Sequence, residues 1–201
     1  MAKVAIVYYS TFGHTTVLAE AMLEGVENVE GVEGAIYQVA ETLSKDALEQ
    51  RKAAPKQDYP LITPEILAEY DGVLFGFPTQ FGAMPPQMAA FFDSCGSLWA
   101  KGALVGKPAG VFVSSGIMGG GVESSPFTTL PFLAHQGMLF VPLGYRTKLV
   151  STKHEVHGGS SWGAGTLSGI TPDMRQPTFL ELECAMVQGQ SFAEITKKLA
   201  A

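Results

Sequence analysis

Short apolar runs and longer amphipathic stretches alternate along this chain from its first residues to its last. Five of the runs are short and apolar enough to be typical of buried β-strands. They cover residues 4–9, 35–39, 71–77, 107–115 and 138–141. Helical patterns lie between them, which is the arrangement of a parallel sheet covered on both faces. We therefore expect an α/β fold, a doubly wound five-stranded parallel sheet with helices on both faces, in a single domain over residues 1–201.

Helical spacing of apolar residues is clearest at the two ends of the chain. Leu18, Met22, Val26 and Val29 mark the first helix, and Leu180, Cys184, Val187, Ile195 and Leu199 mark the last. Shorter helices are expected around residues 46–52, after Thr63-Pro64, after Pro85-Pro86 and around 127–136, because Thr caps and first-turn prolines favour helix starts. Residues 145–176 form a glycine-rich stretch without periodicity. A loop of that length is usually functional or shared with a neighbouring subunit.

Composition and charge exclude several classes of partner. Of the 201 residues, 46% are hydrophobic and 16% charged, so much of the chain is expected in a core, a subunit interface or a ligand site. A net charge of −6 argues against nucleic acid, whose binding needs clustered Lys and Arg. No apolar run reaches the length of a membrane span, and we expect no cleaved signal peptide, because residues 1–3 lead straight into the first predicted strand. Cys95 and Cys184 lack metal-ligand spacing, which indicates reduced thiols, a cytoplasmic location and no metal site.

The most specific signal is the loop between the first strand and the first helix. Ser10, Thr11, Thr15 and Thr16 place hydroxyl groups around Gly13. A helix that follows such a loop favours an anion at its N-terminus, through unpaired N–H groups and the helix dipole. The Gly-Lys-Ser/Thr ending of a nucleoside-triphosphate loop and the glycine spacing of a dinucleotide loop are both absent. One terminal phosphate fits, as in FMN, although Ser and Thr are also common simply as helix caps.

Two further loops follow predicted strands and have unusual compositions. Residues 78–84 combine an apolar surface with polar groups, which suits an isoalloxazine ring. Residues 114–121 carry a glycine run that lets backbone N–H groups approach the edge of such a ring. Ligands of open parallel sheets bind beyond the carboxyl ends of the strands, where all three loops would meet. The three loops together therefore favour a single FMN site.

Six segments in order along the chain carry a resemblance to a known family. They are residues 8–14 (YYSTFGH), 75–84 (FGFPTQFGAM), 96–99 (GSLW), 133–138 (LAHQGM), 158–164 (GGSSWGA) and 175–177 (RQP). These segments resemble the tryptophan-repressor-binding-protein (WrbA) type of flavodoxin-like NAD(P)H:quinone oxidoreductases. The resemblance implies a flavodoxin-like fold with bound FMN, NAD(P)H as reductant and quinones as acceptors. It also implies a homo-oligomer, a tetramer.

The resemblance implies roles for individual residues. Cofactor-binding residues would be Ser10, Thr11, Phe12, Gly13, His14 and Thr15 at the phosphate, Pro78, Thr79, Gln80, Phe81 and Gly82 beside the ring, Ser114, Ser115, Gly116, Ile117, Met118 and Gly119 at its polar edge, and His135 on the flavin side of the pocket. Phe12 would also lie near the dinucleotide. Trp99 and Phe81 would form the aromatic walls of a slot shared by NAD(P)H and quinone. His135 would hydrogen-bond or protonate a quinone oxygen, so Trp99, Phe81 and His135 are the expected catalytic residues.

Some positions depart from the family pattern. Gln80 stands where Arg is frequent, Phe12 where Tyr is frequent, and Gln136 where a second His is common. Residues 117–118 replace part of a Thr-rich loop. The missing Arg removes a fixed charge near the flavin or the dinucleotide, which bears on cofactor preference and rate rather than on the fold. No basic pocket for the 2′-phosphate of NADPH is identifiable, so the sequence does not separate NADH from NADPH.

Several of these residues also have a simpler interpretation. Trp99 alone fits a core or interface aromatic, and His135 alone fits a capping or core histidine. Cys95 fits either a redox-sensitive thiol or, more simply, a small core residue. Residues 154–157 (HEVH) lack the spacing of a helical zinc motif. Residues 114–116 (SSG) lack the glycine pattern of a hydrolase nucleophile turn.

Three functions are compatible with an FMN site. The first is a two-electron quinone reductase with ping-pong kinetics, since one slot would serve both substrates. The second is a flavodoxin-type electron carrier, and the third is an FMN-binding regulatory or scaffold protein. Carriers usually have a strongly acidic docking face, and they have no use for Trp99, His135 and the long late loop. The sequence therefore favours the reductase.

Overall fold

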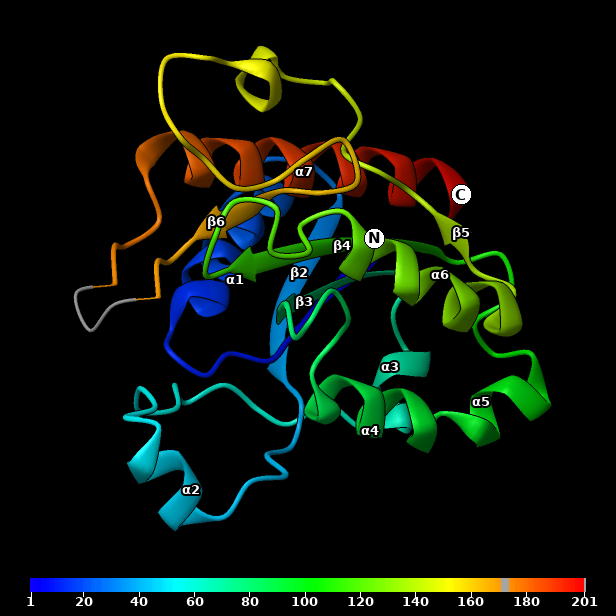
Figure 1. Ribbon diagram of the computed structural model, residues 1–201. Helices are drawn as coiled ribbons and strands as arrows, with labels where there is room; N and C mark the ends of the chain where they lie inside the picture. Colours follow the sequence, from blue (N-terminus) through cyan, green and yellow to red (C-terminus); the bar gives the residue numbers. More distant parts are fainter. Residues whose placement is uncertain (171–173, 201) are drawn as a thin grey trace.

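Successive residues of strand β1 (Ala2–Tyr8) face two different hydrophobic cores. Val4, Ile6 and Tyr8 pack into one core, while Ala5 and Val7 pack into the other, and all five are essentially inaccessible to solvent. Side chains of a strand alternate between the faces of its sheet, so a strand that is apolar at every position must be covered on both sides. The computed structural model, which describes residues 1–170 and 174–200, shows this layered α/β arrangement (Figure 1).

The main sheet is parallel and has the strand order β2-β1-β3-β4-β5. Its strands after β1 are β2 (Val32–Gln38), β3 (Gly72–Pro78), β4 (Pro108–Ser115) and β5 (Leu139–Phe140). The predicted doubly wound five-stranded sheet is confirmed. A sixth strand, β6 (Gly165–Leu167), pairs with the carboxyl end of β4.

The prediction that residues 145–176 lack regular structure was incomplete. The described part of this segment contains a 3₁₀ helix, η1 (Lys148–Ser151), as well as β6. Elements of three or four residues are too short to show a periodicity in the sequence. Residues 171–173 of the predicted loop lie outside the described part of the chain.

Helices cover both faces of the sheet, as predicted. Helices α1 (His14–Glu27) and α7 (Phe179–Leu199) pack on the face that receives Val4, Ile6 and Tyr8. The opposite face is covered by α3 (Pro64–Ala68), α4 (Pro86–Ser94), α5 (Gly96–Lys101) and α6 (Ser124–Gln136). Helix α2 (Lys45–Gln50) has no buried residue and projects beside the sheet (Figure 1). Helix α5 was not predicted, because six residues beginning with glycine carry little helical signal.

Helices α1 and α7 approach each other closely through two glycines. A Cβ atom at Gly25 would overlap the backbone oxygen of Met186, and one at Gly189 would overlap that of Met22. Close contact of this kind lets the two longest helices bury a shared apolar face. Across the described residues, no helix is both long enough and apolar enough to span a membrane.

Candidate functional site

The loop after β1 forms a surface of hydrogen-bond donors. Gly13 adopts the left-handed conformation (φ 91°), and its N–H donates to Ser10 Oγ at 3.0 Å. Helix α1 begins at His14 and has no acidic residue in its first turn, so its unpaired N–H groups keep their positive potential. The buried Thr15 hydroxyl lies 3.0 Å from Ser114 Oγ, which joins this loop to the end of β4. These features make a cradle suited to a phosphate group.

A cavity of about 650 Å³ lies over the cradle, within the range typical of small-molecule sites. Ten of the predicted cofactor-binding residues line it: Ser10, Thr11, Phe12, His14, Pro78, Thr79, Gln80, Ser114, Ser115 and Gly116. They come from the loops that follow β1, β3 and β4, which are the three loops expected to meet. Gly13 and Thr15 belong to the cradle loop but do not line the cavity, and the Thr15 side chain is inaccessible to solvent.

The loops after β3 and β4 hold each other in place at one side of the cavity. The Thr79 hydroxyl donates to the Gly120 oxygen at 2.8 Å, and the Thr79 N–H donates to the Ser114 oxygen at 2.8 Å. Phe81, at the tip of the first of these loops, has a left-handed backbone (φ 50°), and its side chain is fully exposed. A non-glycine residue pays a conformational cost in that region, so the backbone holds the aromatic ring outward at the rim.

Other predicted cofactor residues lie beside the main cavity. Phe81, Gly82, Ile117 and Gly119 line a shallow depression that adjoins it across Gln80 and Ser115. Met118 is exposed on the same loop. These positions border the site and do not form its floor.

Trp99 and His135 lie outside the cavity in a single chain. Trp99 is on α5 and 62% exposed, and His135 is exposed in the last turn of α6. Helix α5 and the last turn of α6 lie toward the amino-terminal end of β4, away from the cradle loop (Figure 1). The expectation that these two residues touch the flavin pocket is therefore not met within one chain, because α5 and the end of α6 lie at the amino-terminal ends of β4 and β5, whereas the cradle loop follows the carboxyl end of β1.

The segment after β6 supplies a wall that was not predicted residue by residue. Ser168, Gly169, Ile170 and Met174 line the cavity opposite the β3 loop. The Ser168 N–H donates to the Ser115 oxygen at 2.8 Å, which anchors the wall to β4. The glycine-rich composition marked the segment as functional, but nothing in it distinguished these positions from their neighbours.

A buried carboxylate holds this wall. Glu181, in the first turn of α7, is inaccessible to solvent and accepts hydrogen bonds from Gly158 N–H and Thr166 Oγ1, both at 2.7 Å. It also pairs with the guanidinium of Arg175 and completes a capping box with Thr178. One side chain thus connects both ends of the glycine-rich segment to α7.

A second carboxylate organises the other side of the cradle. Glu41 accepts hydrogen bonds from Tyr9 Oη at 3.0 Å and Gln87 Nε2 at 2.7 Å, and it pairs with Lys56 Nζ at 3.1 Å. Burial raises its pKa, but the backbone N–H of Leu43 and these three partners outweigh burial and lower the pKa to about 2. Burial, followed by the hydrogen bond to Glu41, raises the pKa of Tyr9 to about 12. Glu41 is therefore ionised and Tyr9 neutral at physiological pH.

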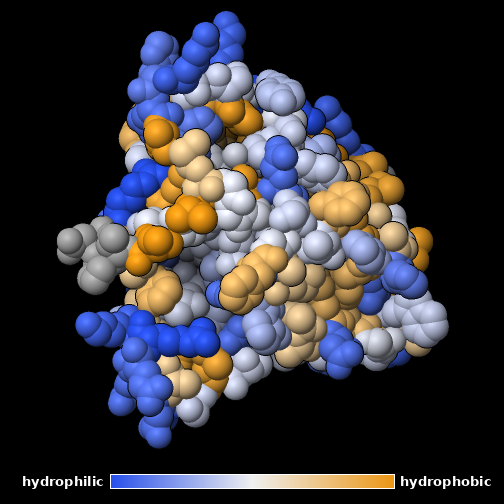
Figure 2. Space-filling view, in the orientation of Figure 1, coloured by the Kyte–Doolittle hydropathy of each residue, from blue (hydrophilic) through white to orange (hydrophobic). Residues whose placement is uncertain are grey.

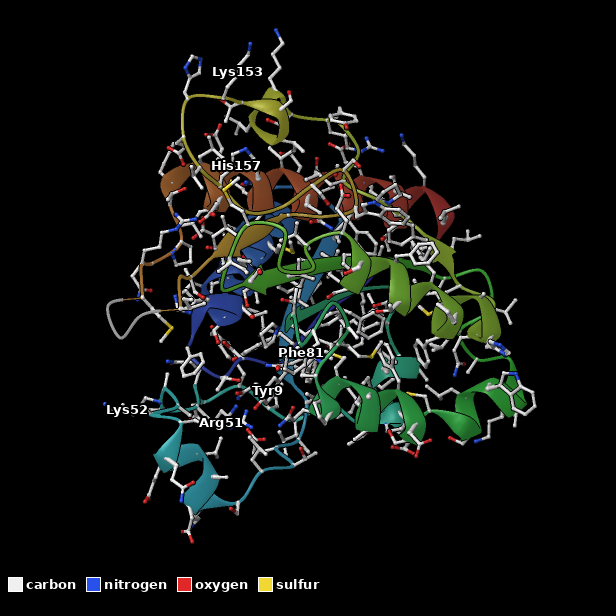
Figure 3. The ribbon with its side chains drawn as sticks, in the orientation of Figure 1. Tyr9, Arg51, Lys52, Phe81, Lys153 and His157 are labelled. Carbon is white, nitrogen blue, oxygen red and sulfur yellow. The ribbon has the colours of Figure 1, made fainter. Side chains whose placement is uncertain are left out.

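Arg51 and Lys52 line the cavity and were not singled out in the sequence. They follow α2 within a polar stretch, where an adjacent Arg and Lys carry no motif. Figure 3 shows Arg51 just below Tyr9 and Lys52 farther to the left, and Figure 2 shows a hydrophilic surface at the lower left of the molecule, over α2. The cavity therefore has a basic edge.

The two cysteines are core residues. Cys95 is inaccessible and Cys184 is 5% exposed. Burial raises the pKa of each thiol to about 11, so both are inert thiols at neutral pH. The described residues contain no cluster of three or more His, Cys, Asp or Glu side chains arranged for a metal ion.

The residues present fit a flavin mononucleotide. The cradle offers N–H and hydroxyl donors for one phosphate, and Ser114 to Gly116 place polar groups where a ring edge would lie. The φ of 91° at Gly13 and the free space around it allow a phosphate to approach the backbone. Fold and site together define a flavodoxin-like flavoprotein.

Comparison with known proteins gives the family. The model of the NADPH-dependent FMN reductase family matches residues 2–147. A "Quinone-oxidoreductase QR2" of Triphysaria versicolor is 48% identical over 98% of this chain and 96% of its own. An "NAD(P)H quinone oxidoreductase PST3" of Candida albicans is 49% identical over 98% of each chain. The chain belongs to the NADPH-dependent FMN reductase family, in the group that contains these quinone oxidoreductases.

Solved structures agree on the fold. A flavodoxin, WrbA-like protein from Agrobacterium tumefaciens aligns with a TM-score of 0.66 and 22% identity, covering 98% of this chain and 99% of that one. Oxidised Flavodoxin 2 from Bacillus cereus aligns with a TM-score of 0.59 and 17% identity, covering 96% and 99%. The predicted family, the flavodoxin-like fold and FMN as cofactor are confirmed.

Proposed function

We propose that this protein is an FMN-dependent NAD(P)H:quinone oxidoreductase that reduces quinones to hydroquinones in two-electron steps by a ping-pong mechanism. The observation that supports it most directly is the meeting of the β1, β3 and β4 loops around one cavity with a phosphate cradle at its base. Relatives that are nearly half identical over almost the whole chain carry quinone oxidoreductase names.

The side chains around the cavity have distinct tasks in this proposal. Ser10 and Thr11, with the N-terminus of α1, hold the phosphate, and the buried Thr15 hydroxyl ties this loop to Ser114. Thr79 keeps the β3 loop in register with the β4 loop, and Gln80 borders the open side. Bound FMN supplies the redox chemistry, accepting a hydride from NAD(P)H and passing two electrons to a quinone.

A single cavity accounts for the ping-pong order. The main cavity, of about 650 Å³, runs into the depression of about 570 Å³ beside Phe81, because both are lined by Thr79, Gln80 and Ser115, so the two form one continuous open space next to the cradle. NAD(P)H and quinone would then occupy the same space in turn. The oxidised nicotinamide must leave before the quinone binds, so the two substrates never meet.

Trp99 and His135 would act at the active site of a second copy of the chain. Both are exposed and distant from the cavity of their own chain, so a role at the quinone requires a homo-oligomer, a tetramer by resemblance, that brings them to a neighbour's site. Trp99→Ala and His135→Ala should then lower kcat/KM for quinones without changing FMN affinity. If the native protein is a monomer in solution, these two roles are wrong. The buried, inert thiols fit the cytoplasm as the compartment.

Anaerobic stopped-flow absorbance on the FMN-loaded protein tests the proposal. Mixing with NADPH or NADH should bleach the flavin rapidly, and subsequent benzoquinone should restore the absorbance just as fast. Initial rates at several fixed quinone concentrations should give the parallel double-reciprocal lines of ping-pong kinetics.

Two outcomes would reject the reductase. If NAD(P)H leaves the flavin absorbance unchanged while dithionite bleaches it, the protein is an electron carrier. If the flavin is bleached but neither benzoquinone nor a longer-chain quinone restores it, quinones are not the acceptors. Failure of the protein to retain FMN would reject the cradle itself.

A further inference from the structure

The turn after α2 places two adjacent cations on the cavity. Arg51 ends the helix, and Lys52 adopts a left-handed backbone (φ 54°), with its N–H bonded to the Glu49 oxygen at 2.9 Å. Both residues line the main cavity next to the cradle. A left-handed conformation is costly for lysine, and such strain persists where the surroundings enforce it. The turn therefore holds the pair at the cavity.

The cradle loop itself holds this turn. The Ala54 N–H donates to the Thr11 oxygen at 2.9 Å, and Lys56 Nζ donates to the Ser10 oxygen at 2.8 Å. Lys56 also pairs with Glu41 and lies over the Tyr9 ring, 4.3 Å from its centroid. The basic pair thus stands at a set position relative to the phosphate cradle.

Arg51 and Lys52 differ from Lys56 in having no carboxylate partner. Within residues 1–170 and 174–200, the ion pairs found are Lys56–Glu41 and Arg175–Glu181, so neither member of the basic pair is neutralised there. Two neighbouring cations repel each other, and a chain of net charge −6 offers many acidic residues that could have balanced them. Unbalanced cations on a cavity wall favour an anionic ligand.

A small pocket continues from the main cavity at Arg51. It has a volume of about 210 Å³ and shares Thr11, Arg51 and Gln80 with the main cavity. Phe81 and the prolines at the start of α4 make most of its lining apolar. Arg51 therefore stands between a large site suited to a flavin and a small one suited to a flat heteroaromatic ring.

The phosphate of FMN does not need this pair, because the cradle already supplies its donors. A nicotinamide dinucleotide carries two further sets of anionic oxygens, the pyrophosphate and, in NADPH, the 2′-phosphate beside the adenine. Guanidinium groups bind phosphate in a bidentate manner, and ammonium groups add a point charge. With the nicotinamide in the main cavity and the adenine in the small pocket, the phosphates come to Arg51 and Lys52.

We propose that Arg51 and Lys52 bind the phosphate groups of the nicotinamide dinucleotide and select NADPH over NADH through its 2′-phosphate. This inference rests on the proposed reductase function. It assigns the basic site that the sequence alone did not reveal, and it names the pair as specificity-determining residues for the reductant.

The test compares two double variants with the native FMN-loaded protein. Arg51→Gln with Lys52→Gln removes the basic pair. Lys45→Gln with Lys153→Gln removes the same charge from α2 and from the distant loop after η1, and neither residue lines the cavity (Figure 3). Calorimetric titration with adenosine 2′,5′-bisphosphate and with 5′-AMP measures phosphate recognition without any turnover.

We expect the Arg51→Gln, Lys52→Gln protein to bind adenosine 2′,5′-bisphosphate about tenfold or more weakly, with a smaller change for 5′-AMP. Its kcat/KM should fall about tenfold for NADPH and less for NADH, mainly through KM. FMN affinity should stay within about twofold of the native value, and the control variant should match the native protein in every assay.

Three results would overturn the inference. If both double variants bind the bisphosphate with equal affinity, Arg51 and Lys52 do not take part in nucleotide recognition. Equal losses with NADPH and NADH would eliminate the 2′-phosphate as the target. A parallel loss of FMN affinity would assign the pair to the cofactor phosphate instead. A native protein that binds the bisphosphate through the pair but oxidises no NAD(P)H with quinones would refute the reductase and leave the nucleotide site intact.

Discussion

The Nε2 atom of His14 lies 2.8 Å from the backbone oxygen of Arg175. A carbonyl oxygen only accepts, so Nε2 of the buried imidazole donates this hydrogen bond to the late segment. The two residues are 161 positions apart, and their hydrogen bond joins the first turn of α1, beside the phosphate cradle, to the cavity wall that follows β6. The side chain of the same Arg175 pairs with Glu181, so cradle, wall and α7 form one connected unit.

Replacing His14 by Ala should weaken FMN binding roughly tenfold. The change leaves the partly buried Arg175 oxygen without its donor, which costs about 1 kcal/mol and loosens the wall. Fluorescence titration of the apoprotein with FMN measures the effect. His14→Gln, which restores an N–H donor, should recover part of the affinity. Equal FMN affinity in the native and Ala proteins would show that the bond does not support the site.

Replacing Glu181 by Gln should destabilise the fold by roughly 2–4 kcal/mol. The amide nitrogen would face donors that now bond a carboxylate, and Arg175 would lose its partner. Urea unfolding monitored by circular dichroism gives the free energy of unfolding. Glu183→Gln, an exposed position on the same helix, is the matched control. A Glu181→Gln protein as stable as this control would contradict the prediction.

Protonation of Glu41 should lower the free energy of unfolding in acid. Its folded-state pKa of about 2 lies below the ordinary value of 4.5, so the folded state favours the ionised carboxylate. The resulting stabilisation is fully present above the ordinary pKa and is lost as the pH falls from there toward the folded-state value. Glu41→Gln should flatten this limb of a plot of unfolding free energy against pH. An unchanged acid limb in the variant would exclude Glu41 as its source.

Gly189→Ala should lower the stability by roughly 2–3 kcal/mol, because the added methyl group would overlap the Met22 oxygen and push α1 from α7. Gly96→Ala makes the opposite case. No atom lies within 4 Å of a Cβ at Gly96, so helix propensity should leave stability unchanged or slightly raised. Thermal unfolding of both variants measures the difference. If the Gly189→Ala protein melts at the same temperature as the Gly96→Ala protein, α1 and α7 move apart without loss of stability.

The regular part of the fold was predictable because its signals are local. A window of about ten residues is enough to recognise the fully apolar runs of β1, β3 and β4, and the same holds for the hydroxyl-rich loop before α1. The parallel order then brings their carboxyl ends to one edge of the sheet. Ten of the predicted cofactor residues meet in the cavity for that reason.

The remaining parts of the site depend on contacts between distant segments. Lys52 reaches the cavity only because the turn after α2 is bonded to the cradle loop, and Met174 only because Arg175 bonds to His14 and Glu181. No pattern within either segment encodes these contacts. Trp99 and His135 show the converse, since a family resemblance named them but the tertiary structure of one chain keeps them away from the site.

The pairing of β4 with β6 has a consequence for the order of events during folding. Val113 pairs with Gly165, and Val4 pairs with Gly72, so the strands that frame the cavity close long stretches of chain. Such closures are slow, because their entropy is lost before the contacts form. The last wall of the flavin pocket, which includes Ser168 and Met174, is thus completed only after most of the polypeptide has been made, and FMN bound to the completed pocket would draw the equilibrium away from open forms. Cellular flavin supply would in this way govern how much of the newly made chain escapes proteolysis.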